Sequence, residues 1–337
     1  MKSTLKDVSI VVVTYQGDEI TKNCLDSLAA ACGDDPQVVV VDNSPSEATR
    51  HMVAAYPNTV YVSSPGNPGF AGGNNRALPH CDRPYVLLLN NDTIVHTRES
   101  IERMVEFLDE NPKCGVVQGC GRLPNSDNAL SGCGSYLMPI GFLWATGLYE
   151  KESPEFDVPH PCFMVGGFFL MFRRRDLKRF GGFLFRSDFW CYYEESDFCH
   201  RVWLSGMEVW YIPTPPIDHI MGATAGKFAW NGVMERYLRN VLFSLEANLS
   251  FWSRVRMLPL TRTLIAGHAL MCLLRGRWPF FKAEASALFM SRHDKKRLAA
   301  ARRQIRRLRK VSDREIFKAV VRMPPLSRLL AHFKSRV

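Results

Sequence analysis

The sequence of 337 residues predicts an α/β protein in which helices flank a mostly parallel, Rossmann-like sheet, followed by a basic helical C-terminal region. Three observations lead to this prediction. In the first 110 residues, apolar runs rich in valine alternate with segments of helical spacing, which is typical of βαβ units. Several of these runs end abruptly in Asp or Asn. Lysine and arginine are concentrated after residue 250.

The first two strands are predicted at residues 8–14 and 38–41, where β-branched residues predominate. Between them, apolar residues recur at helical spacing over residues 20–31. Residues 47–56 are predicted to form a second helix and residues 58–63 a third strand. This order predicts parallel strands whose carboxyl ends meet at one edge of a sheet.

A fourth apolar run, residues 85–89, ends in Asn90, Asn91 and Asp92, and a helix is expected over residues 101–108. Ligands of open α/β sheets bind at the carboxyl ends of the strands. Asp92 is therefore expected at the ligand-binding edge, as an oxygen ligand suited to Mg²⁺ or Mn²⁺. The alternative is a strand followed by an Asx-turn. Because the second strand likewise ends in Asp42, a nucleotide site is favoured.

Residues 66–76 contain four glycines in eight positions, which would let the backbone approach a ligand closely. The sequence has neither GxGxxG nor GxxxxGK[ST], so it lacks the phosphate-binding turns of dinucleotide and P-loop proteins. We expect a ligand-binding loop here, and the alternative is an ordinary mobile loop.

In the second half, the pair Gly166 and Gly167 opens an apolar strand over residues 165–174. A helix is then expected up to Gly206, a natural stop. Three acids, Glu194, Glu195 and Asp197, lie at its start. The helix macrodipole favours acids there, but it does not account well for three acids flanked by large aromatic residues.

These motifs, taken in order, resemble the family-2 inverting glycosyltransferases with the GT-A fold, and most closely the bacterial rhamnosyltransferase-like branch. The resemblance covers about residues 7–225. The segments that carry it are Val12-Val13-Thr14-Tyr15, Val41-Asp42-Asn43-Ser44, residues 66–75 and Leu89-Asn90-Asn91-Asp92.

The resemblance implies which residues bind the nucleotide sugar and the metal. Asp92 would be the principal carboxylate ligand of a Mg²⁺ or Mn²⁺ ion, because the two positions before it are amides. His219 would be a second ligand through its neutral imidazole. The expected nucleotide-sugar-binding residues are Thr14, Tyr15, Asp42, Asn43, Gly72, Gly73, Asn74, Asn90 and Asn91.

The resemblance also assigns the general base to the second acid of a pair, which here is Glu195. Many relatives have Asp at this position, so the longer Glu is a departure from the family pattern. Glu194 remains a rival for the base, and Asp197 completes the expected catalytic acids.

Charge divides the chain near residue 250, after a helix expected over residues 228–248. Residues 251–337 contain 22 of the 43 lysines and arginines but only four of the 33 acids, so they carry +18 and the preceding part −8. We expect a catalytic domain over residues 1–250, with a nucleotide-binding half to about residue 120 and an acceptor half after it. Residues 125–160 are candidates for shaping the acceptor site.

The basic region contains two segments of different composition. Residues 257–274 are largely apolar and are expected to lie at a membrane interface or re-enter it, with a full span as the alternative. Residues 292–323 interleave apolar and basic residues, as helices on an anionic cytoplasmic leaflet do. The alternatives are a helical hairpin packed on the catalytic domain, or binding to nucleic acid, which is less favoured.

Cysteine usage fits a reducing compartment, because ten cysteines at irregular spacings include no CxxC pair. The first strand begins within about eight residues, so no signal peptide is expected.

The expected function is transfer of a sugar from a nucleoside diphosphate to a lipid-linked or cell-envelope glycan, at the cytoplasmic side of the membrane. The branch resemblance alone suggests dTDP-rhamnose as donor. One alternative is a UDP-sugar-dependent galactosyl- or galactofuranosyltransferase. An alternative of another class is a non-catalytic nucleotide- or RNA-binding scaffold. Each of these functions is compatible with an oligomer.

Overall fold

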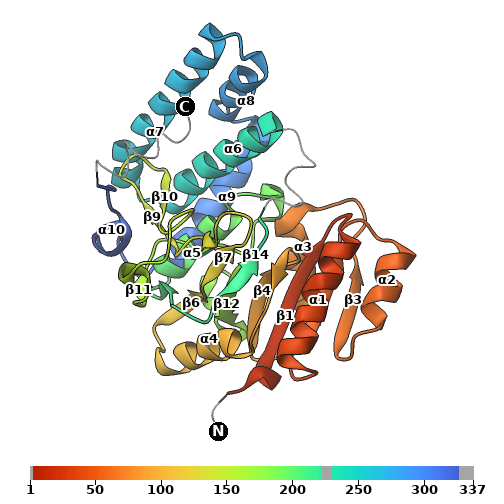
Figure 1. Cartoon of the computed structure of the whole chain (residues 1–337). Helices are drawn as coiled ribbons and strands as arrows, with labels where there is room; N and C mark the ends of the chain where they lie inside the picture. The colour runs from red at the N-terminus through yellow and green to blue at the C-terminus, as the bar shows by residue number, and fades with distance from the viewer. Residues whose placement is uncertain (1–2, 222–229, 326–337) are drawn as a thin grey trace.

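A computed structural model of the chain describes residues 3–221 and 230–325. Its centre is an eight-stranded sheet in the order β11-β13-β6-β12-β4-β1-β2-β3, flanked by helices (Figure 1). The strands of this sheet are β1 Val8–Thr14, β2 Gln37–Asp42, β3 Thr59–Ser63, β4 Tyr85–Asn90, β6 Cys114–Gln118, β11 His160–Pro161, β12 Phe169–Arg173 and β13 Glu208–Tyr211.

The first half of the chain confirms the predicted βαβ alternation. Strands β1, β2, β3 and β4 pair in parallel. The valines and leucines of β1, β2 and β4 are buried except Val13, whereas Val60 and Val62 of β3 are partly exposed. In register, Thr14 lies opposite Asp42 and Val13 opposite Asn90, so the polar strand ends meet at one edge as predicted. The helices of this half are α1 Asp18–Cys32, α2 Glu47–Ala54, α3 Gly69–Ala77 and α4 Glu99–Glu110.

The glycine-rich segment is a helix and not the expected loop. Helix α3 packs on β1 and β2 so closely that a Cβ on Gly73 would lie 2.7 Å from Val13 Cγ1. At its first residue, Gly69 has a φ of +76°, and a Cβ there would lie 2.2 Å from the Trp190 carbonyl oxygen. These glycines permit close helix packing, and that use was mistaken for loop flexibility.

A second, four-stranded sheet brings the metal motifs together. Its order is β5-β14-β7-β8, and His219 at the end of β14 pairs with Thr93 of β5, directly after Asp92. A separate two-stranded sheet, β9-β10, belongs to the acceptor half. The strands are β5 Thr93–Ile94, β7 Gly121–Leu123, β8 Ala129–Leu130, β14 Ile217–His219, β9 Ser135–Leu137 and β10 Leu143–Ala145.

Short 3₁₀ helices connect several of these elements. They are η1 Leu5–Asp7, η2 Leu78–His80, η3 Pro154–Phe156, η4 Arg174–Phe180 and η5 Ser187–Phe189. All ten cysteines are free and nine of them are buried, as expected for reduced core thiols.

The C-terminal part is helical, and α7 and α8 project away from the central sheet (Figure 1). The helices after β12 are α5 Glu194–Leu204, α6 Trp230–Asn248, α7 Phe251–Leu274, α8 Trp278–Leu288, α9 Arg292–Leu308 and α10 Asp313–Val320. Of the helix expected over residues 228–248, the first two residues lie outside the described ranges. Helix α6 ends at Asn248, where the change in charge begins.

The apolar stripe of the basic helices is buried inside the protein. Leu298 and Ala301 of α9 form one cluster with Phe189 and with Phe243 of α6. Ile305, Leu308, Ile316 and Val320 join the main core. The expectation that this stripe faces a membrane is therefore wrong for α9 and α10, and the packed-hairpin alternative describes them. Glu246 of α6 additionally binds Arg254, Arg262 and Arg302.

Helix α7 differs from α9 because much of its apolar surface is exposed. It is the one helix in the described ranges that is long and apolar enough to cross a membrane, and a third of its apolar window is buried within the protein. Exposed residues along α7 and at the start of α8 are Trp252, Val255, Leu260, Leu264, Leu270, Met271, Leu274 and Trp278.

Candidate functional site

Asp92 and His219 lie side by side at the carboxyl edge of β4. The pairing of β14 with β5 sets His219 Nε2 3.5 Å from Asp92 Oδ1. Both residues are 6% exposed. Asp92 Oδ1 is buried and has no hydrogen-bond partner among the described residues. The sequence prediction that these two residues come together is thus matched by the geometry.

Three neighbours fix the ring of His219. Its Nδ1 lies 2.7 Å from Ser131 Oγ, and the ring stacks on Phe168 with 4.5 Å between centroids. Asn90 Nδ2 lies 3.4 Å from Nε2. With the proton on Nδ1, His219 donates to Ser131 and its Nε2 lone pair accepts from Asn90; a metal bound at Nε2 would take the place of the Asn90 hydrogen bond. Such an outer partner on the second ring nitrogen is typical of metal-binding histidines.

The pair fits a divalent cation. A buried carboxylate oxygen and an imidazole lone pair that face each other repel unless a proton or cation lies between them. An unpaired buried carboxylate oxygen is also costly, and a cation would remove that cost. Oxygen and imidazole ligands suit Mn²⁺ and Mg²⁺ sites.

The acid pair begins α5 after a strained segment. Trp190, Tyr192 and Tyr193 have φ values of 61°, 67° and 71°, in the left-handed region that bulky residues avoid. Each costs of order 1–3 kcal/mol, and such residues cluster at functional sites. Asn240 of α6 stabilises this segment by donating hydrogen bonds from Nδ2 to the carbonyls of Phe189, Cys191 and Tyr192.

Glu194 and Glu195 differ in their surroundings. Glu194 is 2% exposed, and its Oε2 has no hydrogen-bond partner in the described part of the chain. Glu195 is partly exposed, and its Oε1 accepts a hydrogen bond of 3.3 Å from the Gly167 N–H. Burial raises the pKa of both carboxyl groups, and the charge of Glu195 raises that of Glu194 further. Glu195 is therefore the acid that a substrate can reach.

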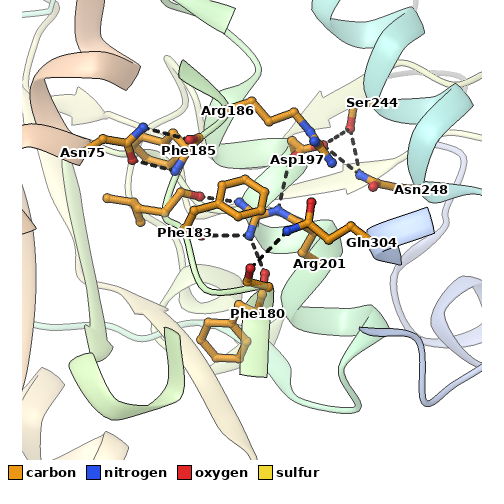
Figure 2. A network of polar contacts seen from close by, with 12 residues as sticks. Asn75, Phe180, Phe183, Phe185, Arg186, Asp197, Arg201, Ser244, Asn248 and Gln304 are labelled. Carbon is orange, nitrogen blue, oxygen red and sulfur yellow. Dashed lines mark hydrogen bonds and ion pairs between the residues drawn. The ribbon is translucent and has the colours of Figure 1, made fainter. Parts of the chain in front are cut away.

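The carboxylate of Asp197 is fully engaged in hydrogen bonds and ion pairs (Figure 2). Oδ1 accepts from Arg186 Nε at 3.1 Å, from Asn248 Nδ2 at 2.9 Å and from Ser244 Oγ at 3.2 Å, while Oδ2 accepts from Arg201 Nε at 3.0 Å. Although burial acts to raise its pKa, Arg186 and Arg201 lower the pKa to about 2. This corrects the expected catalytic role: Asp197 has no exposed surface and anchors α5.

Among the expected nucleotide-binding residues, several side chains are used to build the edge itself. Thr14 Oγ1 accepts hydrogen bonds from Thr21 and from Asn91 Nδ2. Asp42 has no exposed surface, and its two oxygens accept from Ser44, Ser46 and Tyr61. The turn after β2 would have to open before a ribose hydroxyl reached this carboxylate.

The remaining expected residues form two groups: those whose side chains or backbone hold the edge together, and those that are partly exposed. Asn43 bridges Ser64 and the Gly69 carbonyl, and Asn74 donates to the Phe70 carbonyl within α3. Gly72 and Gly73 are buried in α3. Tyr15 and Asn90 are partly exposed, so they present surface to a ligand at this edge.

Sequence reasoning missed the residues that orient the site: Ser131, Phe168 and Asn240. Ser131 lies within residues 125–160, which were considered only as candidates for shaping the acceptor site. Asn240 lies in a helix with no motif. Gly167 was predicted only as half of a glycine pair. The absence of a side chain there leaves room for the Glu195 carboxylate, because a Cβ on Gly167 would lie 2.9 Å from Glu195 Oε1.

Comparisons with known proteins agree with this geometry. The family model described as glycosyl transferase family 2 matches residues 9–181. The low-salt glycan biosynthesis hexosyltransferase of Haloferax volcanii is 28% identical over 210 residues, which cover 59% of this chain and 62% of that protein. The O-antigen chain rhamnosyltransferase of Salmonella anatum is 28% identical over 152 residues, which cover 44% of this chain and 45% of that protein.

A solved structure shows the same fold. The mannosyltransferase of Pyrobaculum calidifontis, in complex with GDP-Man and Mn²⁺, matches with a TM-score of 0.50 and 18% identity. The match covers 87% of this chain and 79% of that structure. The matched regions span less than two thirds of the length of the two relatives above.

Proposed function

This chain belongs to glycosyl transferase family 2, whose model matches 173 of its 337 residues, and we propose that it transfers a sugar from a nucleoside diphosphate to a glycan acceptor with inversion. Its mixed sheet flanked by helices is the GT-A fold. The observation that carries the proposal is the facing pair of Asp92 Oδ1 and His219 Nε2, 3.5 Å apart at the edge where such sheets bind ligands.

Asp92 and His219 would hold a divalent metal, Mn²⁺ or Mg²⁺. When bound, such an ion neutralises negative charge that builds up on a leaving diphosphate. Ser131, Phe168 and Asn90 hold the imidazole with Nε2 toward Asp92. The chain thereby keeps a metal-ligating lone pair in place without reorganisation when donor binds.

Glu195 is proposed as the general base. Inverting transfer requires a group that accepts the proton of the attacking acceptor hydroxyl. The raised pKa of Glu195 brings its basicity closer to neutral pH, and the Gly167 N–H holds one oxygen while the other can accept the proton. Burial and the charge of Glu195 raise the pKa of Glu194 further, so Glu194 would hold the proton of the pair while Glu195 is ionised and able to act as the base.

For the donor sugar, we propose rhamnose from dTDP-rhamnose. The support is the branch resemblance and the similarity to the rhamnosyltransferase of Salmonella anatum. The alternative within the same chemistry is a UDP-galactose or UDP-galactofuranose donor. A non-catalytic RNA-binding scaffold is the alternative of another class, and it is disfavoured because many basic side chains of the C-terminal region are paired with acids inside the protein.

For the acceptor, we propose a lipid-linked or cell-envelope glycan reached at the cytoplasmic face of a membrane. Helix α7 and the start of α8 expose nine large apolar side chains, Phe251 and the eight named above, and Arg256, Arg275 and Arg277 of the same segment are also exposed. Apolar and basic side chains on one surface are typical of peripheral association with anionic lipid.

The test is a donor panel. The purified full chain is incubated with UDP-, GDP- and dTDP-sugars in the presence of Mn²⁺ or Mg²⁺, and release of the nucleoside diphosphate is measured. The proposal predicts metal-dependent release from at least one donor, with dTDP-rhamnose the fastest. Salt-sensitive RNA binding without turnover of any donor would instead establish the scaffold alternative.

A further inference from the structure

An arginine-lined cavity lies between η5 and α9. Its volume is about 520 Å³. Arg186, Arg297, Arg303 and Arg307 line it, with Asp188 as the acid among its lining residues. A smaller neighbouring cavity shares Asp188 and Arg297 and adds further residues, including Arg236, Arg239, Asp294 and Phe289. Because they share lining residues, the two cavities together are called the groove below.

Within the groove, Arg186 is the side chain that points to a ligand. It is 9% exposed, its Nε donates to Asp197, and its buried Nη2 has no hydrogen-bond partner among residues 3–221 and 230–325. A buried guanidinium nitrogen without an acceptor is unfavourable unless a ligand supplies one. Asp197 occupies the Nε side of this guanidinium, so Nη2 is the nitrogen left without an acceptor, and Arg186 is also one of the residues that line the cavity.

Arg297 brings a second positive charge close to Arg186. Both guanidinium groups lie over the ring of Phe243, at 5.6 Å for Arg186 and 5.2 Å for Arg297. Arg297 is paired with Asp188 and Asp294. Burial and the charge of Arg186 lower the pKa of Arg297.

We propose that this groove binds the phosphate or diphosphate group of the acceptor. Guanidinium groups present paired N–H donors that match phosphate oxygens, and several of them converge here. Asp188 and Phe189 line the groove and immediately precede the strained segment that leads into the acid pair, so a bound anion would border that segment. Exposed Phe289 at the rim offers an apolar surface to the lipid that carries such a diphosphate. This inference rests on the proposed function.

The binding test uses inorganic pyrophosphate as the probe, titrated calorimetrically into the full chain in EDTA. EDTA removes the divalent metal that pyrophosphate would need at Asp92 and His219. We expect the double variant Arg303→Ala, Arg307→Ala to bind at least tenfold more weakly than wild type. Its matched control is Arg292→Ala, Arg306→Ala, which removes two exposed arginines of α9 outside the groove and should keep wild-type affinity. Equal loss in both variants, or no binding by wild type, would overturn the site.

A second measurement identifies the source of the phosphate. Phosphatidylcholine vesicles carrying a few per cent polyprenyl diphosphate are compared with vesicles carrying phosphatidylglycerol at equal charge. The proposal predicts that Arg303→Ala, Arg307→Ala loses binding to the polyprenyl diphosphate vesicles alone. Loss of binding only to the phosphatidylglycerol vesicles would make the groove a phospholipid headgroup site and overturn the acceptor assignment.

Transfer assays separate this inference from the proposed function. With a diphosphate-linked acceptor, KM should rise at least tenfold in Arg303→Ala, Arg307→Ala and stay unchanged in the control. Transfer with an unchanged KM in both variants would overturn the groove while the function stands. If pyrophosphate binding depends on Arg303 and Arg307 but the chain turns over no donor, the groove is supported as an anion site and the proposed function is overturned.

Discussion

Asp197 shows how an acid within a catalytic motif can serve the fold. Its carboxylate accepts hydrogen bonds from two buried arginines, Arg186 and Arg201, and its pKa falls to about 2. The pattern of acids in the sequence cannot distinguish this role from catalysis, because both place a carboxylate at a helix start. What decides it is the position of Arg186, eleven residues earlier, and of Asn248 in another helix.

Replacement of Asp197 by Asn should destabilise the fold at pH 7 by about 3–5 kcal/mol, since it leaves two buried cations without their counter-ion. A lowered folded-state pKa gives stability that is present above the unfolded pKa of 3.8 and is lost as pH falls toward 2. Urea unfolding of wild type and variant should therefore differ most at neutral pH and converge between about pH 4 and pH 2. Ser244→Ala, which removes the hydroxyl that donates to Asp197 and accepts from Asn248 but leaves the charges paired, should cost only about 1 kcal/mol. A neutral-pH difference no larger than that of Ser244→Ala would refute the anchoring role.

Glu195→Gln keeps the shape of the side chain but cannot accept a proton. Because base catalysis contributes about 10²–10⁴-fold, kcat should fall by that factor with donor affinity little changed. Glu194→Gln is the comparison, and it should retain more activity because Glu194 is almost fully buried. Single-turnover rates with bound donor measure the chemical step. An inactive Glu194→Gln beside an active Glu195→Gln would reverse the assignment within the pair.

Sequence reasoning at this scale identified Asp92, His219 and the acid pair but not their supports. The first set lies in motifs with an order along the chain. Ser131 and Phe168 act through contacts that only strand pairing creates, between segments separated by dozens of residues. A lone serine or phenylalanine carries no local signal for such a role.

At the scale of elements, α3 shows why glycine content was misleading. The sequence of residues 69–77 has low helix propensity, and the predicted loop followed from it. Tertiary packing overrides that propensity, because the absent side chains let the helix rest directly on β1 and on the Trp190 segment. The strands, by contrast, were predictable, because short continuous runs of Val, Ile and Leu are typical of strands buried on both faces of a parallel sheet.

Gly69→Ala tests the contact between α3 and the strained segment. Its matched control is Gly66→Ala, which has a similar positive φ of +83° but open space around the added Cβ. Both should lose about 1 kcal/mol from backbone strain. Gly69→Ala should lose a further 1–3 kcal/mol, since the Cβ would overlap the Trp190 carbonyl, and its kcat should fall as the acid pair shifts. Thermal unfolding and kcat measured for both variants check this, and equal effects would contradict it.

At the scale of the whole molecule, the charge division near residue 250 does not separate two independent bodies. Arg262 and Arg302 bind Glu246 across it, and α9 packs on α5 and α6. Net charge predicted that a boundary exists, and α6 does end there. It could not predict that the basic helices complete the core, because the apolar stripe that packs against protein looks the same as one that packs against lipid.

Membrane association is therefore tested by surface substitutions and not by truncation. Trp252→Glu with Leu274→Glu places two charges on the exposed face of α7, where both side chains are more than two-thirds exposed. Its control is Tyr149→Glu with Val158→Glu, an equal charge change at exposed apolar residues of the acceptor half. Cosedimentation with anionic liposomes should be lost in the first variant and kept in the second. Equal sedimentation of both would refute the α7 surface as the contact.

The central claim is that Asp92 and His219 form the metal site of a nucleotide-sugar transferase, and metal-dependent donor turnover tests it most directly. Asp92→Ala and His219→Ala should each lower turnover by at least about a hundredfold, because charge on the leaving diphosphate loses several kcal/mol of stabilisation. Asp218→Ala removes the neighbouring acid, whose carboxylate pairs with His96 at 2.9 Å, and should retain wild-type turnover. Circular dichroism confirms that each variant folds. Undiminished Mn²⁺- or Mg²⁺-dependent turnover in both Asp92→Ala and His219→Ala would contradict the account.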